Sequence, residues 1–155
     1  MPSKPRPPLE IEKSIDEKAS QVREAASELN KRIEFFEEYL SRLRGKVEAF
    51  TYIAHPERDD PMDNLELGLK FHREGKAWQI SYGDYKPLYH DEHPIDWKPL
   101  REAPLKLKIA GVMMFPDLLQ AIERSQLQLV AKITEAIKEF DDFAASLKEE
   151  KGGAK

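Results

Sequence analysis

The sequence has no cysteine among its 155 residues, which excludes disulfide bonds, a thiolate nucleophile and any zinc or iron–sulfur site built on cysteine. A metal site would have to use histidine and carboxylate ligands. Glycine is also scarce, with seven residues, and no segment matches a phosphate-binding glycine loop, a nucleophile elbow or a dinucleotide-binding fingerprint. The sequence therefore carries no catalytic or nucleotide-binding motif, and we expect neither an enzyme nor a cofactor.

Long hydrophobic runs are missing as well. The longest uninterrupted apolar run, Ile109 to Phe115, has seven residues, whereas a membrane-spanning helix requires about 20. The N-terminus, MPSKPRPP, is basic and proline-rich, and a charged segment follows it instead of the apolar stretch of an export signal. We therefore expect a cytoplasmic protein that does not enter a membrane.

Neither sign of charge is in large excess, because 25 basic residues face 29 acidic ones and the formal net charge is -4. This balance argues against binding nucleic acid through its phosphates. With 40% apolar and 35% charged residues, the chain has the composition of one folded domain. We place that domain at residues 9–148, between a disordered proline-rich tail at 1–8 and a flexible tail at 149–155 that contains two glycines.

Two long segments, residues 9–44 and 116–148, are predicted to be helices. Neither contains a glycine or an internal proline; Gly45 follows the first, and Pro116 suits the first position of the second. Apolar residues repeat every seven positions in both segments, in two series offset by three or four, as in a coiled coil. In the second helix Val130, Ile137 and Ala144 widen the apolar stripe on one side.

We expect these helices to pack as a long antiparallel hairpin, with facing residue numbers that sum to about 162. In this arrangement Ala19 lies opposite Phe143 and Val22 opposite Phe140, which keeps the volume of each layer nearly constant. Gln126 is the one polar residue at the interface. The candidate interface residues are Ile15, Val22, Leu29, Ile33, Phe36, Leu40, Leu119, Ile122, Leu129, Val130, Ile133, Ile137, Phe140 and Phe143.

Residues 47–104 between the helices have a different character. Val47 to Ala54 is β-branched and aromatic, and apolar residues alternate with polar ones at 65–71 and at 78–82, so we predict a three-stranded antiparallel meander. A proline-rich loop follows at 83–104, and then a short helix at 104–114. The predicted fold class is α+β, with a coiled-coil-like hairpin flanking a small β-sheet module.

The loop after the sheet holds the residues that could bind a ligand. His90 and His93 are weak candidates for metal ligands, because zinc-type sites need three or four ligands that converge from rigid elements. Tyr85, Tyr89 and Trp97 could form an aromatic platform for a ligand, although covering the open face of a small sheet is the simpler role. No metal and no cofactor are therefore assigned.

The function predicted from the sequence is self-association or protein–protein interaction through the heptad helices, without catalysis. The widened stripe needs more cover than a two-helix interface gives, from the sheet, from a second copy of the chain, or from a partner's helix, and we expect a homo-oligomer. One alternative is a ligand-binding or metal-binding protein, or a small enzyme, with its site between the sheet and the 84–104 loop. Another is an acidic inhibitor or adaptor, since residues 47–104 carry 7 basic and 12 acidic residues.

Overall fold

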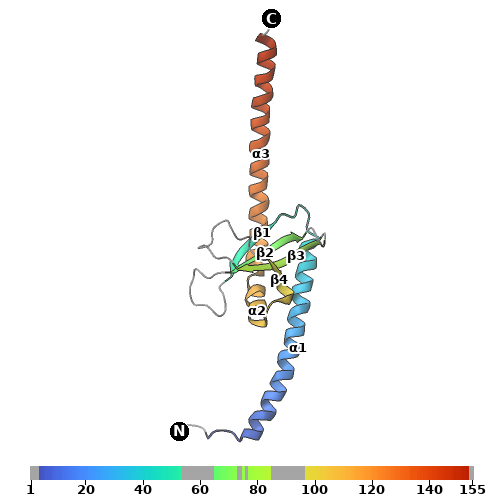
Figure 1. Ribbon diagram of the computed structural model, residues 1–155, viewed down its shortest axis with the longest axis vertical. Coiled ribbons are helices and arrows are strands. Elements are labelled where there is room, and N and C mark those ends of the chain that lie inside the picture. The colour runs from blue at the N-terminus through green and yellow to red at the C-terminus, as the bar shows by residue number, and fades with distance from the viewer. Residues whose placement is uncertain (1–3, 54–64, 73–74, 76, 85–96, 154–155) are drawn as a thin grey trace.

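The computed structural model describes residues 4–53, 65–72, 75, 77–84 and 97–153. Within these ranges it is a mixed α and β structure, as predicted, with three α-helices and one antiparallel sheet (Figure 1). The helices are α1 (Pro8–Ser41), α2 (Leu105–Met113) and α3 (Phe115–Gly153), and a short 3-10 helix, η1 (Leu100–Glu102), precedes α2. The strands are β1 (Ala49–Ile53), β2 (Leu65–His72), β3 (Ala77–Asp84) and β4 (Lys98–Pro99).

The sheet has the strand order β1-β2-β3-β4, with every neighbouring pair antiparallel. In this register Leu67 of β2 pairs with Thr51 of β1 on one side and with Tyr82 of β3 on the other. The predicted meander is thus present, but a fourth strand is added where Ser81 pairs with Pro99. A strand of two residues has no alternation that a sequence pattern could reveal, and its proline is tolerated at an edge that needs no further hydrogen bond.

One face of the sheet carries the core. Side chains at alternate positions of β2 and β3 point to this face, and Leu67, Leu69 and Ile80 are fully buried there. The second half of α1 packs against β3 with Ile33 and Leu40, and the first half of α3 packs against β1 and β2. The other contributions to this core are Leu118 and Ile122 from α3, Leu100 from η1, and Leu107 from α2.

The two long helices leave this core in opposite directions, so the predicted hairpin is wrong. In Figure 1 the first half of α1 extends from one end of the sheet module and the second half of α3 from the other, and the two termini lie at opposite ends of the molecule. The hairpin would have paired Ile33, Leu40 and Ile122 with residues of the other helix. In the structure these three side chains pack in the core that covers the sheet, so they are not available for that pairing. The predicted interface between the two helices of one chain is therefore not formed.

The element boundaries also differ from those expected. α1 ends at Ser41, three residues before the predicted end, and Gly45 adopts its left-handed conformation (φ 65°) in the turn beyond the helix. α3 continues to Gly153, five residues beyond the predicted end at 148, because the Lys and Glu residues after Leu147 are strong helix formers. The predicted short helix before α3 is present as α2.

Candidate interaction surface on the helical arms

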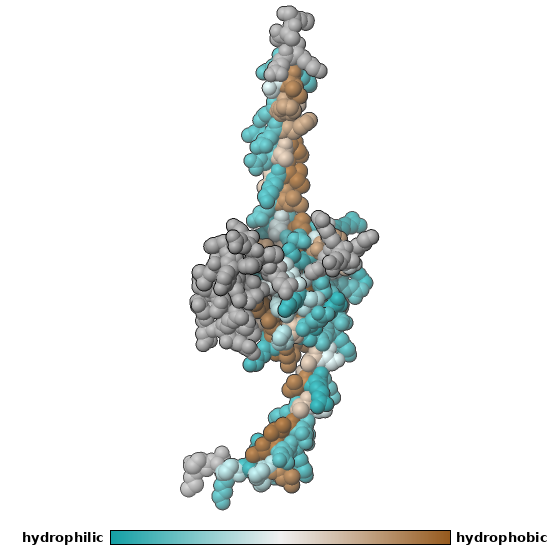
Figure 2. All heavy atoms as spheres, viewed as in Figure 1, coloured by the Kyte–Doolittle hydropathy of each residue, from teal (hydrophilic) through white to brown (hydrophobic). Residues whose placement is uncertain are grey.

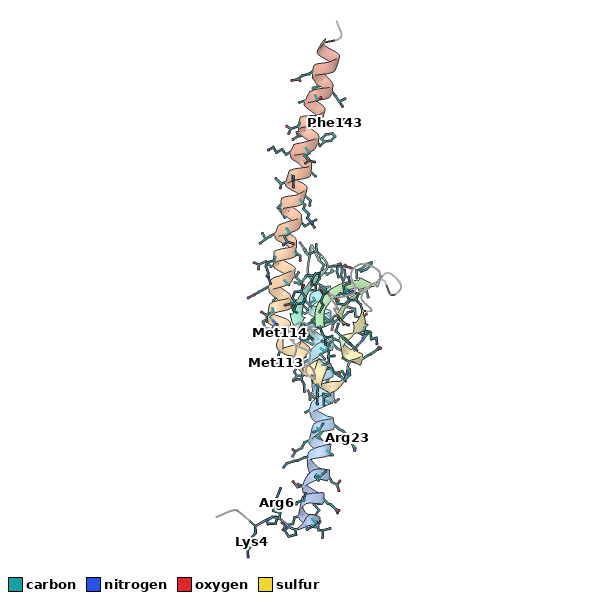
Figure 3. The ribbon with its side chains drawn as sticks, turned by 60° about the vertical axis from the view of Figure 1, so that its left-hand side comes forward. Lys4, Arg6, Arg23, Met113, Met114 and Phe143 are labelled. Carbon is teal, nitrogen blue, oxygen red and sulfur yellow. The ribbon has the colours of Figure 1, made fainter. Side chains whose placement is uncertain are left out.

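The part of α3 that lies beyond the sheet, from Leu129 to Gly153, is called the α3 arm here. It carries a continuous row of exposed apolar side chains, and Phe140 and Phe143 are 64% and 58% exposed. Figure 2 shows this hydrophobic row along the arm, and Figure 3 shows the Phe143 side chain projecting from the helix. We call this row the α3 stripe: Leu129, Val130, Ile133, Ile137, Phe140, Phe143 and Leu147.

The α3 stripe is a consequence of the heptad pattern. Successive residues are offset by about 100° around a helix, so positions three and four apart fall on one face. Ile133, Phe140 and Leu147 form one series, Leu129 and Phe143 belong to the other, and Val130 and Ile137 extend the face on one side. The resulting stripe is about 140° wide. A free helix with such a face is amphipathic, and most of the stability of such helices comes from packing this face against another surface.

α1 has a similar but weaker feature in its first half, Pro8 to Glu28, which we call the α1 arm. Ile11, Ile15 and Val22 are exposed on one face, which we call the α1 stripe. Ala19 and Ala26 occupy the intervening heptad positions, so the α1 stripe is narrower and offers smaller side chains than the α3 stripe. Figure 2 shows its hydrophobic residues on the lower helix.

The residues predicted for the helix interface fall into three groups in the structure. Ile33, Leu40 and Ile122 are buried in the sheet core, and Leu29 and Phe36 pack at its margin, where the Phe36 ring stacks on Phe115 at 4.3 Å. The others are exposed on the two arms or, for Leu119, at the start of α3, and so stay candidates for an interface: Ile15, Val22, Leu119, Leu129, Val130, Ile133, Ile137, Phe140 and Phe143.

The structure explains why a polar residue, Gln126, occupies an otherwise apolar heptad position. Its amide nitrogen donates hydrogen bonds to the backbone carbonyl oxygens of Arg44, at 3.3 Å, and of Gly45, at 2.9 Å. These carbonyls belong to the turn that follows α1, where no helical partner is available. The polar residue in the heptad therefore joins α3 to the end of α1, instead of facing Phe36 across a helix pair.

A groove that the sequence did not predict runs between β1 and α3, with a volume of about 530 Å³. Phe50 and Tyr52, both half exposed, form its wall on the sheet side, and their rings meet edge to face at 6.4 Å. Arg124 and Lys132 lie on the helix side, and Leu129 belongs both to the groove and to the α3 stripe. The sequence signal for these two residues was the β-branched and aromatic composition of residues 47–54, which predicted a strand but no groove.

The second face of the sheet is polar at its centre. Glu66 is only 4% exposed and Ser81 is fully buried, and both lie on the face opposite that of Leu67 and Ile80. Burial raises the pKa of the Glu66 carboxyl above its ordinary value of 4.5, and the nearby Lys70 ammonium partly counters this effect. The Lys70 ammonium is also 3.0 Å from Glu48 and lies over the Trp97 ring, 4.9 Å from its centre.

Trp97 is the one member of the predicted aromatic platform whose position is described. It is half-buried, and a Cβ at Gly68 would lie 3.4 Å from its ring, so this ring packs on the second face of the sheet. Tyr85, Tyr89, His90 and His93 lie outside the described residues. Among the residues that are described, no group of three or more His, Asp or Glu side chains could hold a metal ion.

No helix in the described part of the chain combines the length and the hydrophobicity that crossing a bilayer requires. Comparison of the chain with protein-family models, with curated proteins and with solved structures finds no match. Any functional proposal for this chain therefore rests on the geometry of its own residues.

Proposed function

We propose that this protein is a non-enzymatic self-association module, and that the α3 stripe is the surface through which it associates. The single observation that carries this proposal is the exposure of a continuous heptad of large apolar residues from Ile133 to Leu147, on the half of α3 that extends away from the sheet module in Figure 1. Monomeric soluble proteins rarely expose a contiguous apolar face of this length, and such faces mark interaction sites.

Energetics support the same function. Burying one exposed Phe, Ile or Leu side chain contributes roughly 1.5–3 kcal/mol, so covering even a few members of the α3 stripe yields several kcal/mol. A helix arm of some 25 residues that stands free in water gains none of this stabilisation and depends on its intrinsic helix propensity. Association would therefore stabilise the arm and remove the apolar face from water in one step.

The test is the molecular mass in solution of the untagged chain and of two variants, measured by light scattering after size exclusion over a range of concentrations. Phe140→Asp puts a charge in the middle of the α3 stripe, where burial without a partner is costly. We expect the parent chain to be a dimer or larger and Phe140→Asp to be monomeric, with association weakened by roughly 100-fold or more.

The matched control is Lys138→Asp, which introduces the same side chain on the opposite side of the same helix. It should keep the mass of the parent chain, and far-UV circular dichroism should show that both variants retain the folded sheet module. A parent chain that stays monomeric at every concentration would contradict self-association, and equal masses for all three proteins would remove the α3 stripe from the interface.

A further inference from the structure

The apolar face of the α3 stripe is complementary to a second copy of the same face. Its two heptad series alone would match a partner helix with apolar residues at two positions per heptad, but Val130 and Ile137 widen it on one side. In an antiparallel helix pair, the positions on that side of one helix face the same positions of the other helix. If both helices are α3 arms, the widened side meets an equally apolar surface.

The α1 arm does not offer such a surface. In the pairing with residue numbers that sum to about 162, the α1 positions beside Val130 and Ile137 are Asn30 and Arg23, a polar amide and a charged group. That pairing would leave the widened side of the α3 stripe partly in water. A second α3 arm covers it with Ile137 of the second copy at the same level as Ile137 and with Ala144 beside Val130.

One register fills every layer of an antiparallel pair of α3 arms. With a twofold axis at the level of Lys138, Ala136 lies opposite Phe140 of the second copy, Ile133 opposite Phe143, and Leu129 opposite Leu147. Each layer occurs twice because of the twofold axis, and the small Ala136 lies opposite the large Phe140, so no layer pairs two small residues. The polar Gln126 falls outside these layers, where it bonds to the turn after α1.

The size of this contact fits a small, reversible dimer. The apolar layers run from residue 129 to 147, about 27 Å at about 1.5 Å per residue, and a stripe about 140° wide on a helix about 11 Å across is roughly 13 Å wide. The two stripes together would then bury roughly 700 Å², which is the size of a weak, transient interface. Figure 1 shows the sheet module at one end of α3 only, so two antiparallel arms overlap with their modules at opposite ends.

From this juxtaposition we infer that the occupant of the α3 stripe is the α3 arm of a second copy of the chain, antiparallel and centred on Lys138. This inference rests on the proposed function, and it adds the partner, the orientation and the register. The α1 stripe takes no part in this contact.

The absence of native cysteine allows the register to be tested by crosslinking. Leu129→Cys and Leu147→Cys are made as separate single variants and oxidised alone and as a mixture. In the inferred register the thiol introduced at position 129 lies beside the thiol introduced at position 147 of the second copy, whereas two identical thiols are about 18 residues, or about 27 Å, apart along the pair. A disulfide needs Cα atoms within about 7 Å, so we expect a covalent dimer only from the mixture.

Each other outcome is informative. Efficient crosslinking of Leu147→Cys with itself would show parallel arms, and crosslinking of a Val22→Cys and Phe140→Cys mixture would show pairing of α1 with α3. A dimeric mass with no crosslink in any mixture would place the interface elsewhere. These three results overturn the inferred register and leave self-association standing, whereas a monomeric mass without crosslinks contradicts both.

Discussion

At the scale of single residues, Gln126 distinguishes the structure from the hairpin that the sequence suggested. In a hairpin its amide would weaken an apolar layer, and leucine would be the better residue. In the structure the amide supplies two carbonyl oxygens of the turn after α1 with a hydrogen-bond donor. The same substitution therefore has opposite expected effects in the two arrangements.

We expect Gln126→Leu to lower the free energy of unfolding by about 1 kcal/mol, the net value of a neutral hydrogen bond whose loss leaves an acceptor unpaired. For a chain of this size the melting temperature should fall by roughly 2–4 °C. The measurement is thermal unfolding followed by circular dichroism, with the exposed Gln120→Leu on the same helix as the matched control. A higher melting temperature for Gln126→Leu than for the parent chain would favour the hairpin instead.

Glu66 makes the stability of the fold depend on pH, and the direction of its pKa shift sets the sign of this dependence. Because burial raises the pKa of its carboxyl in the folded chain, the folded state binds a proton more tightly than the unfolded state does. The stability contributed by the protonated form is fully present below the unfolded pKa, and it is lost as the pH rises through the folded pKa. At neutral pH the ionised and buried carboxylate therefore costs stability.

We expect Glu66→Gln, which keeps the shape without the charge, to unfold at a higher urea concentration than the parent chain at about pH 7 and to lose this advantage below about pH 4. Glu28→Gln is the control of opposite sign, because hydrogen bonding to Lys31 lowers the pKa of that exposed carboxyl and its charge is slightly stabilising. A Glu66→Gln variant that is less stable than the parent at neutral pH would mean that the ionised form is needed by the fold.

At the scale of elements, periodicity predicted both long helices, alternation predicted β2 and β3, and β-branched and aromatic composition predicted β1. These signals are local, since each depends on residues within one segment facing one side. The direction in which α1 and α3 leave the sheet is not local. It depends on which part of each heptad is used by the core, and Ile33 and Ile122 look the same in the sequence whether they face a sheet or another helix.

For the candidate site too, local features were predicted from the sequence and features that depend on the packing of distant segments were not. The apolar residues of the α3 stripe, except Leu147, were among the predicted interface residues, because the heptad and its widened side set the face of a helix. Their exposure was not predictable, since exposure depends on the length of helix that the sheet module leaves uncovered. The groove beside Phe50 and Tyr52 was missed because it is formed by the approach of α3 to an edge strand, and no spacing within either segment encodes that approach.

At the scale of the whole molecule, the two arms at opposite ends give the chain two separate surfaces for association. Pairing of α3 arms is a closed twofold contact that uses one surface in each chain. The α1 stripe would then stand free at both outer ends of such a dimer. A second contact between α1 stripes would join dimers into an open series, and with its alanines it would be the weaker of the two.

We therefore expect Val22→Asp, at a position 54% exposed in the α1 stripe, to keep the dimer and to abolish any growth in mass at high concentration. The measurement is light scattering across a concentration series that reaches the millimolar range, beside the parent chain and the control Ser20→Asp, which lies on the opposite side of α1. The physical reason is that a buried unpaired charge is costly only in the contact that buries it. Conversion of Val22→Asp to a monomer would show that α1 helps to form the dimer itself, and a parent chain whose mass stays at that of a dimer throughout would show that the α1 stripe does not self-associate.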